Sequence, residues 1–329
     1  MEGVLDWVLR EMLGEVGGLD RLVTEFVRVT DKLLPDHVFH RYAPELLNGG
    51  RVRSGQPVFV QLLGGQPGPM AENAARASEL GAPGVDLNFG CPAKTVNRHD
   101  GGATLLKTPR RLFDVAASVR AAVPDALPVT AKVRLGFDHK EYHREIAQAL
   151  EEAGVQHIVV HARTKTEMYT PPAHWTYIRS MREGRTVPFL ANGEIWSVAD
   201  YGRCREAAGV TKVALGRGIV ARPQLALEIR RALGEDQEVE EFDSAAFLDQ
   251  FFQRSLAFRG PEYALARLKQ MLRYWSRDPK FMDAFQRIKT ASTLAQAKEF
   301  LYCLRKEKTW ISSFTPKTTV PSVFAPNSF

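Results

Sequence analysis

The feature that most constrains this chain is a regular alternation of short apolar runs with longer stretches of helical periodicity. Seven β-branched runs recur along the sequence: LVTEFV (22–27), PVFVQLL (57–63), GVDLNF (84–89), PVTAKVRL (128–135), HIVVHA (157–162), VPFLAN (187–192) and TKVALG (211–216). Between them lie helix-period segments such as residues 70–81 and 142–154, each of which ends at a glycine. Mostly apolar strands that alternate with helices indicate parallel βα units with both sheet faces covered.

A barrel built from such units needs eight strands, one more than the seven runs. The opening MEGVLDWVLREMLGEV reads as a loop followed by a helix, which is what should come after a first strand. Either another part of the chain closes the barrel or the first strand lies upstream of Met1, and we favour the second. The expected fold is therefore α/β, a TIM (β/α)8-type barrel over residues 1–237 with its first strand absent from this chain.

Beyond the barrel the pattern becomes helical. Residues 238–308 are expected to form a small all-α bundle, because helical periodicity continues there with few strand signals. The predicted helices span residues 244–259, 263–276, 279–290 and 293–307. Residues 309–329 are rich in Ser, Thr and Pro and contain no acidic residue, which is typical of an unstructured tail.

Charge is concentrated in the C-terminal part. Residues 251–329 hold 14 Lys and Arg against 5 Asp and Glu, although the whole chain carries a net charge of only +6. A basic segment attached to a near-neutral body favours a polyanionic partner. A solvated helical surface explains the charge alone equally well.

Cysteine usage and hydropathy limit the class of protein. Cys91, Cys204 and Cys303 lie far apart without metal-ligand spacing, which predicts a reduced cytoplasmic chain with neither disulfides nor a metal. No apolar run approaches the ~18 residues of a membrane span, and no signal-peptide pattern opens the sequence. We expect a monomer, because no exposed apolar stripe is evident.

Polar residues gather where the apolar runs end, at the edge that forms the active-site face of this kind of barrel. They are Gln61, Asn88, Lys132, Arg134, His161, Arg163, Asn192-Gly193-Glu194 and Gly216-Arg217-Gly218. The last two groups follow the seventh and eighth strands, the usual phosphate position of the fold. Each glycine alone would suggest only a turn, but two such turns on the two expected strands predict a phosphate-bearing ligand.

Two of these residues require an anionic or polar partner. Lys132 and Arg134 lie two residues apart on one strand and therefore point to the same side, into the barrel. Lys132 suits a Schiff-base lysine, or a cation beside an anionic cofactor such as a reduced flavin. Cys91 is unusual in a different way, because it lies on a turn between Gly90 and Pro92 rather than inside a helix or strand.

Together these motifs resemble the tRNA-dihydrouridine synthase family. MEGV, VQLLGG, GVDLNFGCPAKTV, GGATLL, AKVRLG, VVHARTK, ANGEI and ALGRG occur in the family's order over residues 1–235. The segment ARLKQMLRYW (266–275) is similar to the branch of tRNA-dihydrouridine(16) synthases.

The resemblance implies that FMN, reduced by NADPH, delivers a hydride to C6 of a uridine in tRNA. It implies that Cys91 donates a proton to C5, with the uridine turned out of its stack. It also implies FMN contacts from Met1, Glu2, Gln61, Lys132, His161, Asn192, Gly193, Glu194, Gly216 and Arg217. The implied contacts with the target uridine or the rest of the tRNA are Arg28, Asn88, Arg134, Tyr169, Arg267, Lys269, Tyr274 and Lys289.

Three other activities stay compatible with the sequence. One is an FMN-dependent reductase of small molecules such as dihydropyrimidines, which the basic bundle and the FGCP motif argue against. Another is a colourless Schiff-base aldolase that uses Lys132. The last is a tRNA-binding protein that cannot hold flavin without a first strand, for which salt-sensitive tRNA binding would be the signature.

Overall fold

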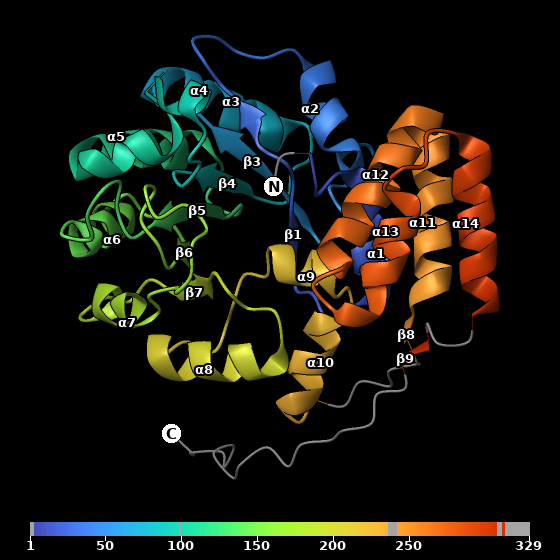
Figure 1. Ribbon diagram of the computed structural model, residues 1–329. Coiled ribbons are helices and arrows are strands. Elements are labelled where there is room, and N and C mark those ends of the chain that lie inside the picture. The colour runs from blue at the N-terminus through green and yellow to red at the C-terminus, as the bar shows by residue number, and fades with distance from the viewer. Residues whose placement is uncertain (1–2, 99, 236–241, 308–310, 313–329) are drawn as a thin grey trace. The chain divides into compact units, whose positions relative to one another are not determined.

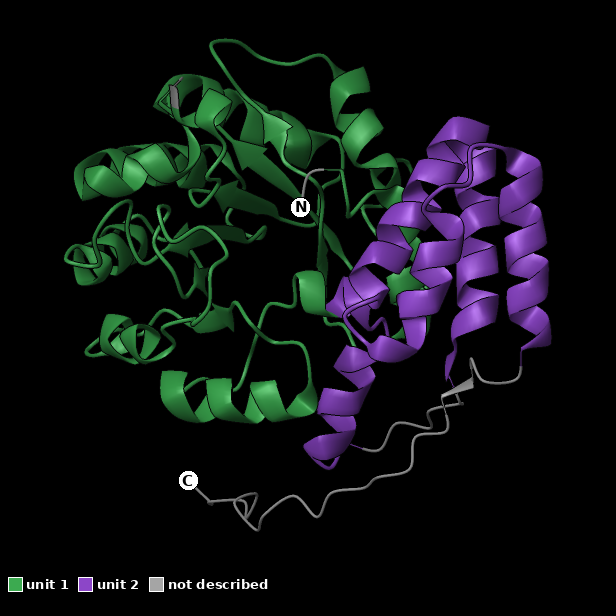
Figure 2. Cartoon of the chain, viewed as in Figure 1, with its two compact units in different colours: residues 1–218 green, residues 219–329 purple. Residues whose placement is uncertain are grey.

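The computed structural model describes residues 3–98, 100–235, 242–307 and 311–312. The chain divides into two compact units, residues 1–218 and 219–329 (Figure 2). The domain boundary predicted at 237/238 falls within a segment outside the described residues. No described helix is long and apolar enough to cross a membrane.

The first unit is built on a curled parallel sheet (Figure 1). Its strands are β1 (Leu22–Val23), β2 (Val27–Arg28), β3 (Val58–Leu63), β4 (Val85–Asn88), β5 (Val129–Arg134), β6 (His157–His161) and β7 (Phe189–Asn192). The order is β1-β3-β4-β5-β6-β7, with β2 also paired to β3 and all pairs parallel. This is the expected barrel-type sheet, and among the described strands β1 and β7 are not paired with each other.

Along residues 7–221 the strands alternate with helices, which pack against the outer face of the sheet after β3 and β7 (Figure 1). They are α1 (Trp7–Val16), α2 (Asp36–Tyr42), α3 (Pro67–Glu79), α4 (Lys94–Arg98), α5 (Pro109–Ala122), α6 (His143–Glu152), α7 (Thr176–Arg182), α8 (Val198–Ala208) and α9 (Arg217–Ala221), with 3-10 turns at Pro44–Asn48 and Gly102–Lys107. Proline begins α3 and α5, where its missing N–H costs no helical hydrogen bond. All six residues of β3 are buried, as the apolar run predicts for a strand covered on both faces.

Two of the seven expected strands differ from the prediction. The run 22–27 forms two short strands, because the hydroxyl of Thr24 accepts the backbone N–H of Gln61 at 3.0 Å in place of a carbonyl. The run 211–216 contributes only an isolated bridge between Val213 and Ala191. Helix α9 begins at Arg217, and among the described residues no strand lies on the far side of Val213 to extend it.

The second unit is helical, as predicted. It contains α10 (Leu225–Ala232), α11 (Ser244–Arg259), α12 (Pro261–Trp275), a 3-10 turn at Pro279–Phe281, α13 (Met282–Ile288) and α14 (Leu294–Lys306). Trp275 is fully buried in its core and donates its indole N–H to the carbonyl of Val220 at 2.9 Å. Strands β8 (Phe242–Asp243) and β9 (Ile311–Ser312) pair antiparallel, so two residues of the expected tail form a strand. The rest of that tail lies outside the described residues.

Candidate active site at the carboxyl ends of the strands

The register of the sheet brings the predicted polar residues together in successive levels. Residues two apart on a strand point to the same face of the sheet, so the side chains of one level point the same way as those of the level before it. From the buried end toward the carboxyl edge, the paired neighbours are Gln61 with Asp86, Asp86 with Thr130, Asn88 with Lys132, Arg134 with His161, and His161 with Asn192.

The deepest level is a hydrogen-bonded network centred on Asp86. Its carboxylate accepts from Gln61 Nε2 at 2.7 Å and from the Thr130 hydroxyl at 2.6 Å. The Gln61 carbonyl oxygen in turn accepts from Asn88 Nδ2 at 2.8 Å. Burial raises the pKa of Asp86, whereas both donors and the cations Arg21 and Lys132 oppose that rise.

Lys132 lies directly above this network. Burial and the neighbouring guanidinium of Arg134 lower the pKa of Lys132 to about 8, against the attraction of Asp86. Within the described residues its ammonium group makes no hydrogen bond or ion pair. A half-buried cation without a protein partner is costly, which indicates that a ligand completes it.

At the carboxyl edge, Arg134 ties two loops together. Its side chain is buried and donates to the carbonyl of Gly90 at 2.8 Å, of Thr164 at 2.9 Å and of Met168 at 2.8 Å. Gly90 precedes Cys91, and Met168 precedes Tyr169. Arg134 therefore fixes the turn of the predicted proton donor and the loop of the predicted tRNA contact to the same strand end.

The turn that carries Cys91 is packed rather than loose. Its backbone oxygen accepts from the Ala103 N–H and from Asn97 Nδ2, both at 3.1 Å. Gly102 has φ +61°, and a Cβ there would lie 2.9 Å from that same oxygen. Cys91 is half-buried and lies within electrostatic reach of Lys132 and Arg134.

The loops after β6 and β7, together with the start of α9, form the other end of the site. Arg163 is fully buried; its Nη2 lies 3.0 Å from Glu194 Oε1 without hydrogen-bond alignment, and Arg217 Nη2 lies 3.8 Å from the same oxygen. Gly193 has φ +110°, and a Cβ there would lie 2.9 Å from His161 Cδ2. Only glycine fits this close approach without strain. Burial and the surrounding cations strongly lower the pKa of His161, so its imidazole is neutral.

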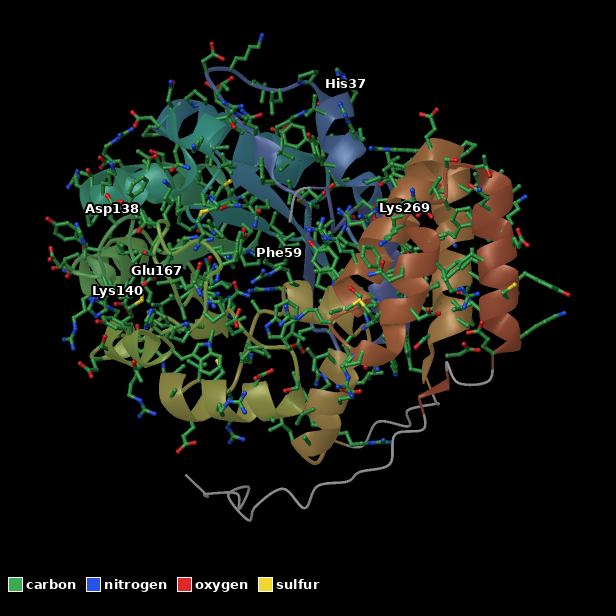
Figure 3. The ribbon with its side chains drawn as sticks, in the orientation of Figure 1. His37, Phe59, Asp138, Lys140, Glu167 and Lys269 are labelled. Carbon is green, nitrogen blue, oxygen red and sulfur yellow. The ribbon has the colours of Figure 1, made fainter. Side chains whose placement is uncertain are left out.

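Tyr169 lies over this cationic end. Its ring centroid is 5.9 Å from that of His161. The guanidinium carbons of Arg134 and Arg217 lie 5.4 and 4.6 Å from the Tyr169 centroid. The side chain is 45% exposed. Its loop is held by Glu167, which accepts the Thr164 N–H at 2.6 Å and pairs with Lys140 (Figure 3). The structure thus places this predicted tRNA contact beside the predicted cofactor residues.

The cationic end suits an anionic cofactor. Four cations meet only two carboxylates there: Lys132, Arg134, Arg163 and Arg217 against Asp86 and Glu194. The phosphate of FMN and the electron-rich edge of a reduced flavin would supply the missing negative charge. The residues present therefore fit a flavin such as FMN: Arg217 would hold its phosphate and Lys132 its ring. No group of three or more His, Cys, Asp or Glu suited to a metal occurs in the described part of the chain.

The remaining predicted residues lie elsewhere. Arg28 is exposed at the end of β2 beside Leu63, Gly216 precedes α9, and Met1 and Glu2 are outside the described residues. In the second unit, Lys269 lines a groove of about 320 Å3 with Glu262 and Ser292. Tyr274 is partly exposed on α12 and Lys289 is exposed just after α13, so both are accessible within that unit.

Arg267 differs from those predicted tRNA contacts. It is 5% exposed, with its guanidinium carbon 5.3 Å from the centroid of Phe251. Within its own unit it packs between α11 and α12.

Asp86 and Thr130 belong to the site but were not predicted from the sequence. A single acid inside the apolar run GVDLNF, in phase with Asn88, was the signal that could have identified Asp86. Arg163 was noted only as a strand-end residue, although its complete burial now makes it a central cation of the site.

Comparison with known proteins agrees with this geometry. The profile of the family described as Dihydrouridine synthase (Dus) matches residues 1–309. A tRNA-dihydrouridine(16) synthase of Pseudomonas putida is 48% identical over 304 residues, which cover 92% of this chain and 94% of the relative. Another from Aquipseudomonas alcaligenes is 50% identical over 274 residues, covering 83% and 87%.

Among solved structures, histamine dehydrogenase from Rhizobium sp. 4-9 has a similar fold. The TM-score is 0.51 at 16% identity, with 74% of this chain and 45% of the other covered. The match of the family profile along nearly the whole length, with two relatives near 50% identity, establishes that this chain belongs to the dihydrouridine synthase family.

Proposed function

We propose that this chain reduces the uridine at position 16 of tRNA to dihydrouridine, with FMN as the bound cofactor and NADPH as its reductant. The observation that carries this proposal is the meeting of two features at one sheet edge. Arg134 joins the Cys91 turn to a cluster of cations that lacks matching carboxylates. The relatives named tRNA-dihydrouridine(16) synthases support the position on the tRNA.

When bound, FMN supplies the hydride for C6 of the uracil. Cys91 donates the proton to C5, and it is placed for this by the bonds that Gly90, Ala103 and Asn97 make around its turn. Asn88, at the end of β4, has an amide N–H and an oxygen lone pair left for the uracil edge after its bonds to Gln61 and Gly90.

The other residues orient the reactants and set charge. Lys132 holds the negative edge of the flavin ring, and Arg217 and Gly193 hold its phosphate end. Because His161 is neutral, it contacts the cofactor without adding to the positive charge already present. Tyr169 offers a partly exposed aromatic ring at the carboxyl edge of the sheet, on which an extruded base can stack.

The second unit supplies binding to the tRNA backbone in this proposal. Its basic C-terminal segment favours phosphate contacts, through cations such as the partly exposed Lys269 and the exposed Lys289. With tRNA as its substrate, the protein would work in the cytoplasm, as a monomer.

The test is an anaerobic titration followed by the visible flavin spectrum. NADPH should bleach the bound flavin, and unmodified tRNA should restore the oxidised spectrum, with dihydrouridine then found at position 16 of that tRNA. A flavin that NADPH reduces but tRNA leaves untouched would contradict the proposal and favour a small-molecule reductase. Dihydrouridine at another position would contradict only the assignment to position 16.

A further inference from the structure

Asp86 lies at one end of a continuous hydrogen-bond chain that reaches the Cys91 turn. Gly90 N–H donates to Asn88 Oδ1 at 3.1 Å, Asn88 Nδ2 donates to Gln61 Oε1 at 2.8 Å, and Gln61 Nε2 donates to Asp86 Oδ2 at 2.7 Å. The chain crosses from β3 and β4 to the loop that precedes the proton donor.

The two ends of this chain give it a single direction. A backbone N–H can only donate, and a carboxylate can only accept. The two amides between them therefore have one arrangement in which every bond is made, since turning either amide would set two donors or two acceptors against each other. Asp86 itself is buried and is held from its other oxygen by the hydroxyl of Thr130.

Gly90 joins this hydrogen-bond chain to the turn that carries the predicted proton donor. Its N–H is bound by Asn88, and its carbonyl accepts from Arg134 Nε at 2.8 Å. Both backbone polar groups of the residue before Cys91 are therefore held, its N–H by the Asp86 chain and its carbonyl by Arg134. The same chain decides which amide atoms of Gln61 and Asn88 are left for ligands.

We propose that Asp86 is a positioning residue, whose carboxylate fixes the orientation of the Gln61 and Asn88 amides and thereby the placement of the Cys91 thiol. This inference rests on the proposed function for its catalytic consequence, but the placement of the thiol is a property of the protein without substrate. Asp86 touches neither the thiol nor the edge where the substrate would lie.

The decisive variant is Asp86→Asn, with Thr130→Val as its matched control. The asparagine is neutral and can present either its oxygen or its NH2 to Gln61, so the chain loses its obligatory acceptor and is anchored only at the Gly90 N–H. Thr130→Val removes the other hydrogen bond to the same carboxylate and leaves the direction intact. Both variants lose one buried polar interaction, so a purely structural role predicts similar effects for both.

The first readout is the alkylation rate of Cys91 by iodoacetamide, followed by mass spectrometry on the full chain as purified, with flavin saturating. We expect Asp86→Asn to raise this rate roughly 3- to 10-fold, because the turn loosens, while Thr130→Val changes it less than about 2-fold. Equal rates in both variants, after correction for any difference in urea midpoint, would overturn the proposal.

The double variant Asp86→Asn, Gln61→Glu moves the carboxylate one step along the chain. The introduced glutamate accepts from both neighbours, so Asn88 again donates to an obligatory acceptor and the chain is anchored at both ends. The Cys91 alkylation rate should return to within about 2-fold of the wild-type rate, even where flavin binding is weakened. This variant keeps one buried carboxylate and so remains informative if Asp86→Asn alone fails to fold. A rate that stays elevated would contradict the proposal.

The second readout is single-turnover oxidation of the reduced flavin by tRNA. Asp86→Asn should slow it roughly 10- to 100-fold, with reduction by NADPH changed less than about 3-fold. Loss of tRNA-dependent oxidation in the wild type would refute the proposed function, while the alkylation comparison would still decide the role of Asp86. Normal oxidation in Asp86→Asn, with wild-type alkylation, would refute the role of Asp86 alone.

Discussion

The two halves of the site differ in how completely their polar groups are paired. On β3 to β5, Asp86 and the amides beside it satisfy one another within the protein. At the other end of the site, buried Arg163 and the partly exposed Arg217 at the start of α9 share the single carboxylate of Glu194. A complete network is set before any ligand binds, whereas a surplus of cations is stable only with an anion beside it. In our proposal the first half positions the Cys91 turn, and the second half binds the anionic cofactor.

The largest expected effect falls on Cys91, where the two halves meet. Cys91→Ala should lower the rate of tRNA-dependent flavin oxidation by roughly 10²- to 10⁴-fold, because the proton donor to C5 is lost. Reduction of the flavin by NADPH should change less than about 2-fold. Stopped-flow measurement of both half-reactions tests this, with Cys303→Ala in α14 as the control. Equal losses in both half-reactions would mean that Cys91 supports flavin binding instead.

The shape of the binding half depends on a glycine. Gly193→Ala places a Cβ 2.9 Å from His161 Cδ2 at φ +110°, and should destabilise the protein by about 1–3 kcal/mol. Gly202→Ala in α8 is the matched control, since its Cβ meets nothing within 4 Å and should stabilise the helix by about 0.5–1 kcal/mol. Urea unfolding measures both, and similar midpoints for the two variants would contradict this packing.

Lys132 should give the free energy of unfolding a distinct pH dependence. The unfolded chain keeps this proton up to its ordinary pKa of 10.5, while the folded chain releases it near 8. Between these values the unfolded state binds more protons, so the stability of the flavin-free protein rises with pH. Lys132→Met should remove this rise, unlike Lys107→Met on the exposed surface. Parallel profiles for the wild type and Lys132→Met would show that Lys132 is solvated.

The smallest effect is expected in the helical unit. Lys269→Gln should weaken tRNA binding by about 2- to 5-fold and reduce the dependence of log Kd on log salt by roughly one. Glu262→Gln, in the same groove, changes charge by the same amount in the other direction and should strengthen binding slightly. Filter binding across a salt series measures both. Identical salt slopes in all three proteins would exclude this groove from the tRNA interface.

Much of the architecture follows from the sequence, because buried parallel strands leave a strong local signal. The runs that became β3 to β7 were predicted to within two residues at each end. The run 211–216 failed because a strand also needs a neighbour on its free side, and apolar composition does not report one. The break in 22–27 depends on a hydroxyl of Thr24 that bonds to a different strand.

Within the site, the sequence located single residues better than it did their partners. Lys132, His161 and Gly193 lie at strand ends and could be identified by position alone. The hydrogen bonds of Asp86 with Gln61 and Thr130 join residues 25 and 44 positions apart, so only the register of the sheet reveals them. Arg267 shows the opposite limit, because the family resemblance implied a tRNA contact there while its burial depends on the packing of α11 against α12.

The most direct test of the central claim compares the affinities of FMN and riboflavin for the same flavin-free protein. The two ligands share the ring and differ in the phosphate, which is the group that the unmatched cations are proposed to hold. We expect FMN to bind at least about 100-fold more tightly by fluorescence titration, with the difference shrinking roughly 10-fold in Arg217→Gln. Equal affinities in the wild type would contradict the account, since the cation surplus would then serve no phosphate.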